Sequence, residues 1–261
     1  MEMFPLAGAI ALQIVLLVAV LGVCVFMLNK LHKVDDSTRA LAVYATRIGQ
    51  ETHAIFPQIQ ALMSLERRLR LAQALPPMRG WAGSPDFLLR VAQEVENRMP
   101  HVIVECGSGI STLVCARTLQ LNGHGHVYSL EHDPRYAERT AALLKEYQLN
   151  EWATVIHAPL NTEHTVTPWY AEAAIPQDIT NIDLVIVDGP PSTIAHFARY
   201  PALPRLADRM SGDVIVIVDD AARSDEQEML RMWAHEFPAF SQTYADCEKG
   251  CALLVRSERS A

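Results

Sequence analysis

The sequence is short of basic residues relative to acidic ones, and this limits the partners that it can bind. Its 261 residues carry 22 Lys and Arg against 30 Asp and Glu, so the formal net charge at pH 7 is −8. Affinity for nucleic-acid phosphates comes largely from clustered Lys and Arg. We therefore expect no nucleic-acid partner. The 50% of hydrophobic residues and 20% of charged residues are typical of a globular chain, which excludes wholesale disorder.

The cysteines lack any pattern that would indicate a metal site or a disulfide framework. Neither a CxxC pair nor a Cys/His zinc spacing occurs in the sequence. The five positions are Cys24, Cys106, Cys115, Cys247 and Cys251. An odd number of cysteines in ordinary core-like segments predicts reduced thiols and a cytoplasmic location for the main domain.

Charge is missing altogether from residues 3–29. Within this run Leu6–Leu28 has Gln13 as its only strongly polar side chain, and as a helix it would span about 35 Å, enough to cross a bilayer core of roughly 30 Å. A buried soluble helix is one alternative, but few such helices are apolar on every face. A cleaved signal peptide is another, but the run lacks a basic start and an A-x-A site. We predict an uncleaved transmembrane anchor in residues 1–30.

The residues beside this span indicate its orientation. Only Glu2 precedes it, whereas Lys30, Lys33 and Arg39 follow it. Cytoplasmic flanks of membrane helices carry an excess of Lys and Arg. We therefore predict a single-pass membrane protein whose remaining residues face the cytoplasm.

Residues 31–80 read as a helical linker or stalk. Apolar residues recur every seven positions at Val34, Leu41, Ile48, Ile55, Leu62 and Leu69. The companion positions of this heptad form a poor seam, and Pro57 breaks the hydrogen-bond ladder inside it. We expect helices that pack on the domain or on the membrane surface. Formation of a homodimer through this stretch is the alternative. Pro76-Pro77 and the cluster at residues 80–85 place the start of the main domain at residue 81, so that it covers 81–261.

The pattern after Pro100 is one of short apolar runs that alternate with amphipathic helices. Strands are predicted at Val102–Cys106, Val127–Leu130, Thr154–His157, Leu184–Val187 and Val214–Val218. Helices are predicted at Ser111–Leu121, Pro134–Tyr147, Ile194–Arg209 and Ser224–Glu236. This alternation is typical of a parallel sheet covered on both faces. Two further runs, Ser241–Ala245 and Cys251–Arg256, flank a short turn and predict an antiparallel hairpin. The fold class is thus α/β, a doubly wound, mostly parallel sheet of seven strands closed by a C-terminal hairpin.

Two glycines follow the first of these strands. Gly107 and Gly109 bracket Ser108 at a strand-to-helix turn, where the missing side chains let a ligand approach the backbone. Glu131 ends the second strand, where a carboxylate can accept hydrogen bonds from both hydroxyls of a ribose. A dinucleotide site prefers a third glycine, but Thr112 stands there. The carboxylate of Glu105 suits a ligand with a sulfonium and an ammonium group.

On these residues the sequence resembles the class I S-adenosylmethionine-dependent methyltransferases, from about Trp81 to Arg256. The E-x-G-x-G loop, the acidic end of the second strand and the terminal hairpin carry the resemblance. It implies a Rossmann-like methyltransferase fold with strand order 3-2-1-4-5-7-6, and S-adenosylmethionine as cofactor. It also implies a set of cofactor-binding residues: Glu105, Gly107, Ser108, Gly109, Ser111, Thr112, Glu131, His132 and Asp188. Ser111 replaces the third glycine common in the family's loop.

Acidic residues end the fourth and fifth strands, at Asp188 and at Asp219-Asp220. Neighbouring strands would bring these carboxylates together, and they would repel one another unless a cation or protons intervene. Oxygen ligands suit Mg²⁺. The arrangement resembles the metal-dependent branch typified by catechol O-methyltransferase, and it implies that Mg²⁺ lowers the pKa of an acceptor hydroxyl. The alternative is that Asp219 or Asp220 caps the helix that begins near Ser224.

The general base stays open at this stage, because Pro191 stands where the catechol enzymes carry a lysine. Asp188 and His196 are the predicted catalytic residues, and Arg199 and His132 are further candidates, each of which also suits a solvated surface position. The long segment Leu160–Asn181 holds Thr165, Trp169 and Tyr170, and we expect either a lid over the acceptor or an ordinary excursion with both aromatic side chains packed beneath it.

The predicted function is methylation, preferably on oxygen, of a small-molecule, sugar or lipid-linked acceptor by a membrane-anchored enzyme. An anchor confines the enzyme and a membrane-borne acceptor to one surface. Two rivals remain: a NAD-dependent oxidoreductase, and a non-catalytic membrane scaffold that retains the fold.

Overall fold

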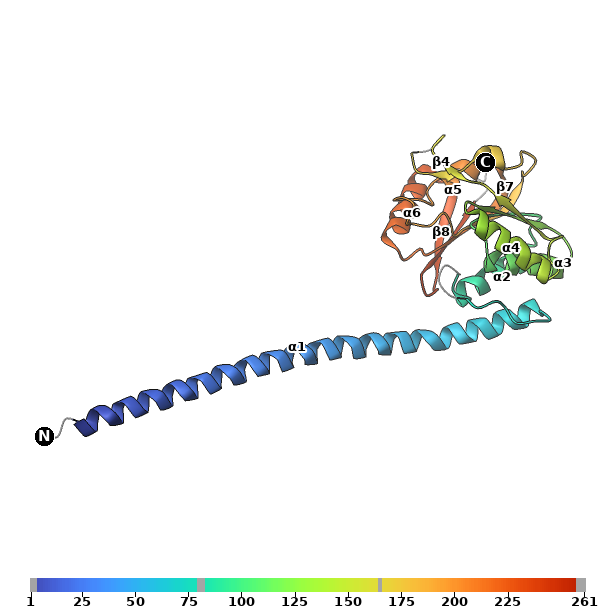
Figure 1. Cartoon of the computed structure of the whole chain (residues 1–261). Helices are drawn as coiled ribbons and strands as arrows, with labels where there is room; N and C mark the ends of the chain where they lie inside the picture. Colours follow the sequence, from blue (N-terminus) through green and yellow to red (C-terminus); the bar gives the residue numbers. More distant parts are fainter. Residues whose placement is uncertain (1–3, 79–82, 164–165, 257–261) are drawn as a thin grey trace. The chain divides into compact units, whose positions relative to one another are not determined.

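A computed structural model describes residues 4–78, 83–163 and 166–256 of the chain (Figure 1). The chain divides into two compact units, Met1–Phe56 and Pro57–Ala261. The predicted domain boundary at Trp81 and the lid residue Thr165 lie outside the described residues.

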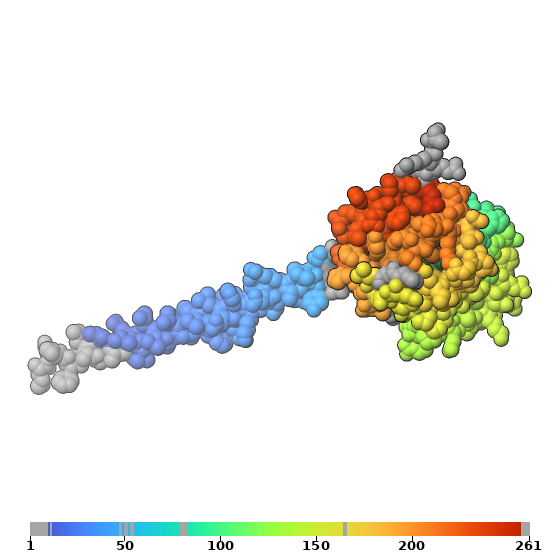
Figure 2. All heavy atoms as spheres, turned by 90° about the horizontal axis from the view of Figure 1, so that it is seen from above, coloured from blue at the N-terminus to red at the C-terminus, as the bar shows by residue number. Residues whose placement is uncertain are grey.

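The first unit consists of the greater part of helix α1 (Phe4–Leu69). Within it, Leu12–Thr46 is long and apolar enough to cross a membrane, and none of its most apolar window is buried. Figure 2 draws these exposed side chains as blue spheres, with Leu17 and Leu21 at 73% and 65% exposure. A signal sequence near an N-terminus has the same length and composition. The structure therefore shows one apolar N-terminal helix of membrane-spanning length.

The second unit begins with the last turns of α1. The helix continues through Pro57, although a proline removes one backbone hydrogen bond. Ala61, Leu65 and Leu69 after it are buried at 7%, 0% and 1% exposure, and this packing holds the helix together beyond the proline. Arg117 closes the end of the helix, because its guanidinium donates to the backbone oxygens of Leu69 and Arg70 at 2.7 and 2.8 Å.

Seven strands form the central sheet of the second unit (Figure 1). Its members are β1 (Val102–Cys106), β2 (His126–Glu131), β3 (Ala153–His157), β6 (Ile182–Val187), β7 (Met210–Asp219), β8 (Phe240–Ala245) and β9 (Cys251–Arg256). Their order is β3-β2-β1-β6-β7-β9-β8. The first five strands in this order are parallel to one another, whereas β9 is antiparallel to both β7 and β8. If only the strands of this sheet are numbered along the chain, without β4 and β5, the order becomes 3-2-1-4-5-7-6, as predicted. The predicted fold class is thus confirmed.

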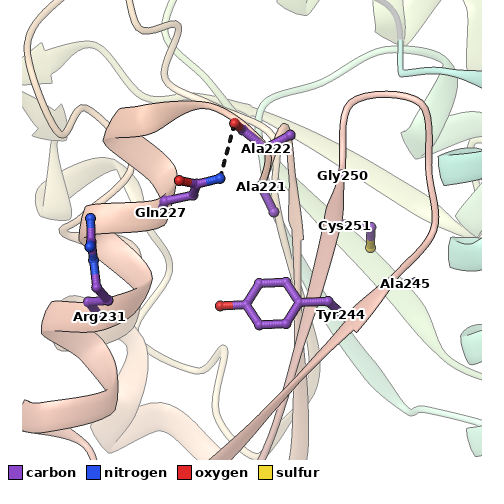
Figure 3. Close-up of a pocket in the computed structure, with 8 residues that line it drawn as sticks. All are labelled: Ala221, Ala222, Gln227, Arg231, Tyr244, Ala245, Gly250 and Cys251. Atoms are coloured by element: carbon purple, nitrogen blue, oxygen red, sulfur yellow. Dashed lines mark hydrogen bonds between the residues drawn. The ribbon is translucent and has the colours of Figure 1, made fainter.

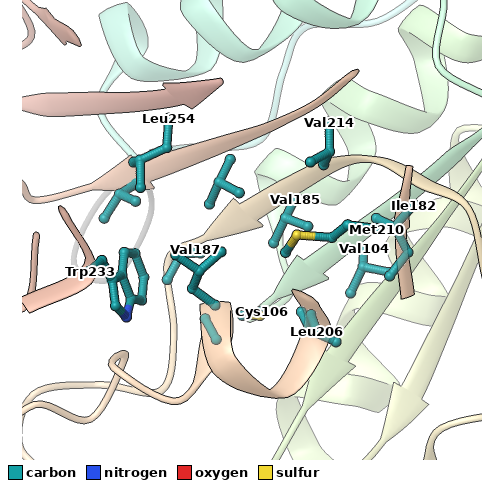
Figure 4. Packing of buried hydrophobic residues seen from close by; sticks show 14 of the residues in the cluster. Val104, Cys106, Ile182, Val185, Val187, Leu206, Met210, Val214, Trp233 and Leu254 are labelled. Atoms are coloured by element: carbon teal, nitrogen blue, oxygen red, sulfur yellow. The ribbon is translucent and has the colours of Figure 1, made fainter. Parts of the chain in front are cut away.

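Helices cover both faces of the sheet because alternate strand residues point to opposite sides. On one face Val185 and Val187 pack with α5 (Ala202–Leu206) and α6 (Ser224–Glu236), where Trp233 is the largest fully buried side chain (Figure 4). On the other face Leu184 and Ile186 pack with the end of α1 and with three more helices. These are α2 (Pro85–Arg98), α3 (Ile110–Asn122) and α4 (Pro134–Glu146).

One predicted helix is wrong over most of its length. In place of a helix over Ile194–Arg209, the structure has turns up to Pro201, the short α5, and the 3-10 turn η2 (Ala207–Arg209). Pro201 and Pro204 lack the backbone N–H that a longer helix needs, and Phe197 adopts a positive φ of 55°.

The segment between β3 and β6 contains two strands that the sequence did not indicate. β4 (Leu160–Asn161) and β5 (Trp169–Tyr170) pair antiparallel as a separate two-stranded sheet, and η1 (Glu172–Ala174) follows. Trp169 and Tyr170 are buried at 2% and 1% exposure and belong to the core beside β6. The second of the two expectations for these aromatic residues, packing beneath the segment, is therefore the one observed.

Candidate active site

A cavity of about 250 Å³ lies where the carboxyl ends of β1, β2, β6 and β7 meet. Ligands of open α/β sheets bind at this edge, outside the carboxyl ends of the strands. Gly107, Ser108, Glu131, His132 and Asp188 line it, as do Asp219 and Asp220. The cavity thus brings together most of the residues that the sequence singled out for the cofactor and for a metal.

The turn after β1 has the backbone conformation that its glycines permit. Gly107 and Gly109 have φ values of 110° and 153°, a region that residues with a side chain rarely enter. The amide of Gly107 donates to the backbone oxygen of Leu130 at 2.9 Å, which ties the turn to the end of β2. Helix α3 starts directly after Gly109, so the turn presents backbone groups to the cavity.

Glu105, Ser111 and Thr112 support this turn from behind and do not line the cavity among the described residues. Glu105 is completely buried and accepts hydrogen bonds from Thr112 Oγ1 at 2.6 Å and Ser129 Oγ at 2.5 Å. Thr112 Oγ1 in turn accepts from the amide of Gly109 at 3.0 Å. Burial raises the pKa of Glu105, and the hydroxyls of Ser111, Ser129 and Thr112 oppose that rise. The structure thus places Glu105 where it fixes the loop through Thr112.

Glu131 is held at the edge of the cavity by neutral donors. Ser108 Oγ donates to its Oε2 at 2.8 Å, and the amide of Asp133 donates to its Oε1 at 3.0 Å. His132 Nδ1 lies 3.0 Å from the same Oε1. Thr140, which the sequence did not indicate, lies 3.1 Å from Ser108 Oγ through its own hydroxyl. The carboxylate is therefore fixed in direction while it still borders open space.

The three aspartates converge as the strand order predicts. One carboxylate oxygen from each of Asp188, Asp219 and Asp220 lies within 4.8 Å of the others. Burial raises the pKa of Asp188 well above its usual range, and the neighbouring Asp219 adds to this. Burial, and then the charge of Asp220, raises the pKa of Asp219 to about 6. These groups therefore hold protons more tightly than ordinary carboxylates.

Arg199 supplies the main positive charge to this cluster. Its Nη2 donates to Asp220 Oδ2 at 2.8 Å, to the backbone oxygen of Asp188 at 2.9 Å and to Asp188 Oδ1 at 3.3 Å. Its Nη1 donates to the backbone oxygen of Asp219 at 2.9 Å and lies 3.7 Å from Glu226 Oε1. Sequence reasoning named Arg199 as a candidate base but missed this role, because its partners lie 11 to 27 positions away along the chain. The side chain is 5% exposed, so a surface position is excluded.

The residues at this end fit a divalent cation. Arg199 and the half-exposed Arg223 both form ion pairs with Asp220 Oδ2. The other oxygen of Asp220, Oδ1, and Asp219 Oδ1 are buried and have no hydrogen-bond partner in the part of the chain that the structure describes. Carboxylate oxygens of this kind are the donors that Mg²⁺ prefers. The capping alternative is not observed, because α6 starts after Arg223 without a side-chain cap.

The structure does not bring His196 to the cavity. Its side chain is 87% exposed, and its Nδ1 lies 3.0 Å from Asp225 Oδ2 on α6. Of the candidates for a base, Asp188, His132 and Arg199 line the cavity, and Arg199 is bound on several sides. Asp188 is therefore the candidate base that combines access with a raised pKa.

A larger hollow of about 400 Å³ lies between α6 and the β8–β9 hairpin, beside Ala221 and Ala222 (Figure 3). Gln227 closes one side by donating to the backbone oxygen of Ala222 at 3.3 Å. No carboxylate or histidine belongs to the described residues that line this hollow. The smaller cavity is therefore the site with chemical capacity.

Residues 104–221 match the family model of a methyltransferase domain. The match begins in β1 and ends directly after Asp220, so it includes the turn at Gly107, the end of β2 and both strands that carry aspartates. No curated protein matches the sequence.

Solved structures with the same fold include several methyltransferases. One from Geobacter sulfurreducens has a TM-score of 0.53 and 14% identity, with 82% of this chain and 96% of that chain covered. The SAH-bound methyltransferase PaMTH1 of Podospora anserina has a TM-score of 0.54 and 17% identity, with 76% and 88% covered. An O-methyltransferase from Bacillus cereus in complex with SAH has a TM-score of 0.51 and 19% identity, with 75% and 90% covered. At these identities the likeness is one of fold.

Proposed function

We propose that the chain is a class I S-adenosylmethionine-dependent methyltransferase, and that it methylates an oxygen atom of a small-molecule, sugar or lipid-linked acceptor at a membrane surface. The match of residues 104–221 to a methyltransferase domain supports this proposal. The single observation that carries this proposal is one cavity bordered by Glu131 on one side and by the three aspartates on the other. Glu131 suits the sugar of the cofactor. The three aspartates suit an acceptor hydroxyl, because they can take up its proton and hold a cation beside it.

Glu131 is the proposed ribose-binding residue. Both of its carboxylate oxygens accept hydrogen bonds within the protein, and Oε2, which accepts from Ser108, has a further lone pair for a ribose hydroxyl. Gly107 and Ser108 line the cavity beside it, and His132 flanks it. A neutral, polar sugar is the ligand that a carboxylate fixed in this way recognises.

The bound cofactor supplies a methyl group on a positively charged sulfur. The remaining chemistry falls to the chain, which must orient the acceptor oxygen and accept its proton. Asp188 is the proposed base of the metal-free site, because it lines the cavity and its raised pKa makes it a better proton acceptor than an ordinary carboxylate. Arg199 holds Asp188 in place through both its backbone and its side-chain oxygen.

Mg²⁺ is the proposed metal, and Asp188, Asp219 and Asp220 would hold it. It would supply a Lewis acid that lowers the pKa of an acceptor hydroxyl. The two buried aspartate oxygens without partners among the described residues support this assignment. Thermal unfolding of the full-length protein with Mg²⁺ and with a chelator tests it, because a bound ion stabilises the folded state. We expect Mg²⁺ to raise the Tm of the wild type and to leave that of Asp219→Asn unchanged.

The apolar part of α1 is the proposed membrane anchor, with the second unit on the cytoplasmic side. The exposed apolar side chains of Leu12–Thr46 and the Lys and Arg residues after residue 29 support this topology. Confinement to the surface favours a membrane-borne acceptor. Association through residues 31–80 into a homodimer stays a prediction, which light scattering of the detergent-solubilised protein would test.

Calorimetry of the full-length protein in detergent tests the proposed cofactor. We expect S-adenosylhomocysteine, the product form of the cofactor, to bind and NAD⁺ not to bind. Binding of NAD⁺ instead would favour the oxidoreductase. Cofactor binding with no methyl transfer to any membrane extract, with and without Mg²⁺, would favour the scaffold.

A further inference from the structure

The hydroxyl of Tyr170 is a buried polar group without a partner in the described part of the chain. Tyr170 is 1% exposed, yet it lines the cavity. Burial of a hydroxyl without a hydrogen bond destabilises a protein. A buried phenylalanine would avoid this loss, so the oxygen atom is expected to serve something other than the stability of the empty protein.

The hydroxyl lies beside the cofactor turn. A Cβ atom added to Gly189 would meet Tyr170 Oη at 2.9 Å, the backbone oxygen of Cys106 at 3.2 Å and Gly107 Cα at 3.3 Å. These three atoms therefore surround the same point, directly after the β6 strand end. The hydroxyl thus lies beside Gly189, whose missing side chain leaves the space that the hydroxyl occupies, and Gly189 in turn lies next to Gly107.

Tyr170 is held firmly in this position. Tyr170 pairs with Leu160 in the two-stranded sheet. The amide of the next residue, Ala171, donates to the backbone oxygen of Pro159 at 2.9 Å. The ring of Trp169 lies edge-on at 4.9 Å between centroids. A group positioned in this way loses little freedom when it binds a ligand.

The hydroxyl keeps its proton at neutral pH and can therefore donate a hydrogen bond. Burial raises the pKa of Tyr170 well above 10, and the nearby charges of Glu131 and Asp188 act in the same direction. A protonated phenol that faces a cavity bordered by carboxylates has one proton to donate. Its natural partner is an oxygen atom of a ligand.

We propose that Tyr170 Oη donates a hydrogen bond to an oxygen atom of the bound methyl donor, and that the β4–β5 segment contributes this residue to the cofactor site. The inference rests on the proposed function and names an additional binding residue within it. The methyl donor is preferred to the acceptor as the partner because Gly189, beside the hydroxyl, lies next to Gly107 of the cofactor turn.

The test is Tyr170→Phe in the full-length protein, which removes only the oxygen atom. By calorimetry we expect the Kd for S-adenosylhomocysteine to rise about tenfold, the effect of one lost hydrogen bond to a ligand. The Tm of the ligand-free variant should equal or exceed that of the wild type, because no protein partner is lost. This combination separates a binding role from a structural one.

Tyr147→Phe is the matched control. Its hydroxyl donates to the backbone oxygen of Ala74 at 2.6 Å, outside the cavity. We expect a lower Tm and an unchanged Kd for this variant. If Tyr170→Phe binds as tightly as the wild type, or if it loses Tm as Tyr147→Phe does, the inference is overturned while the proposed function stands. If the wild type itself fails to bind S-adenosylhomocysteine, both are overturned.

Discussion

The two sides of the cavity hold their carboxylates by different means. Glu131 accepts from a hydroxyl and a backbone amide, both neutral donors, and its Oε1 also lies 3.0 Å from His132 Nδ1. The three aspartates are held by the charged guanidinium of Arg199, and two of their oxygens stay unpartnered among the described residues. Neutral donors fix a carboxylate without changing its charge, whereas a desolvated ionic cluster shifts the pKa values of its members. One side is thus built for recognition, and the other for the handling of protons and charge.

Removal of Arg199 should have the largest effect on stability, and this effect should come from the aspartate side of the cavity. Arg199→Ala leaves buried Asp220 and Glu226 and partly buried Asp188 without their shared cation. Loss of one partner of a buried ion pair destabilises by about 3–5 kcal/mol. Urea denaturation measures this loss. Arg223→Ala is the control: it also pairs with Asp220 but is 42% exposed, so a loss of at most about 1 kcal/mol is expected. Equal losses for the two variants would contradict a central role for Arg199.

The aspartate side of the cavity should make the stability of the protein depend on pH, chiefly through Asp219. The pKa of Asp219 is raised from 3.8 to about 6 in the folded protein, so folding favours the protonated form. Its contribution is fully favourable below pH 4 and is lost as the pH rises through 6. In chelator, Asp219→Asn should therefore exceed the wild type in stability by about 2–3 kcal/mol at pH 8, and the gap should close toward pH 4. Urea midpoints across this range test it, and a constant gap would argue against the shifted pKa.

A change at Glu131 should act on binding more than on stability. Glu131→Gln removes the charge that accepts hydrogen bonds from the ribose, and bonds to charged groups contribute about 1.5–3 kcal/mol. We expect the Kd for S-adenosylhomocysteine to rise roughly 10- to 100-fold in calorimetry. The free energy of unfolding should fall by less than in Arg199→Ala. Unchanged affinity would remove the recognition role from this side of the cavity.

The smallest effect is expected at the neighbouring Asp133. Its side chain accepts from the amide of Arg135 at 2.9 Å and caps helix α4. Asp133→Ala should lower the free energy of unfolding slightly, because the N-cap of α4 is lost. The affinity for S-adenosylhomocysteine should not change, because Asp133 does not line the cavity. A loss of affinity here would mean that the recognition side extends beyond Glu131.

Local signals in the sequence were sufficient for most of the fold. The predicted strand Val102–Cys106 and the helix Ser224–Glu236 have the observed bounds, because apolar runs and helical periodicity are properties of neighbouring residues. The glycine turn and the acidic strand ends were visible for the same reason, and the parallel order then placed Asp188 beside Asp219.

Features that depend on contacts across the chain were not predictable in this way. Arg199 lies in a segment expected to be helical, and its role depends on a fold that brings it to carboxylates on two strands and on α6. His196 has the chemistry of a base and follows Asp188 closely in the sequence, but the turn that contains it leaves its ring exposed to solvent. Tyr170 owes its place to a two-residue strand too short for any periodicity to indicate.

The end of α1 has a consequence for anyone who wishes to shorten the protein. A fragment that starts at Pro57 retains Leu65 and Leu69, whose side chains fill space beneath α2 and α3. A fragment that starts after Arg70 would uncover that apolar surface and remove the carbonyls that Arg117 binds. The first fragment is expected to stay in solution as a single species, and the second is expected to aggregate.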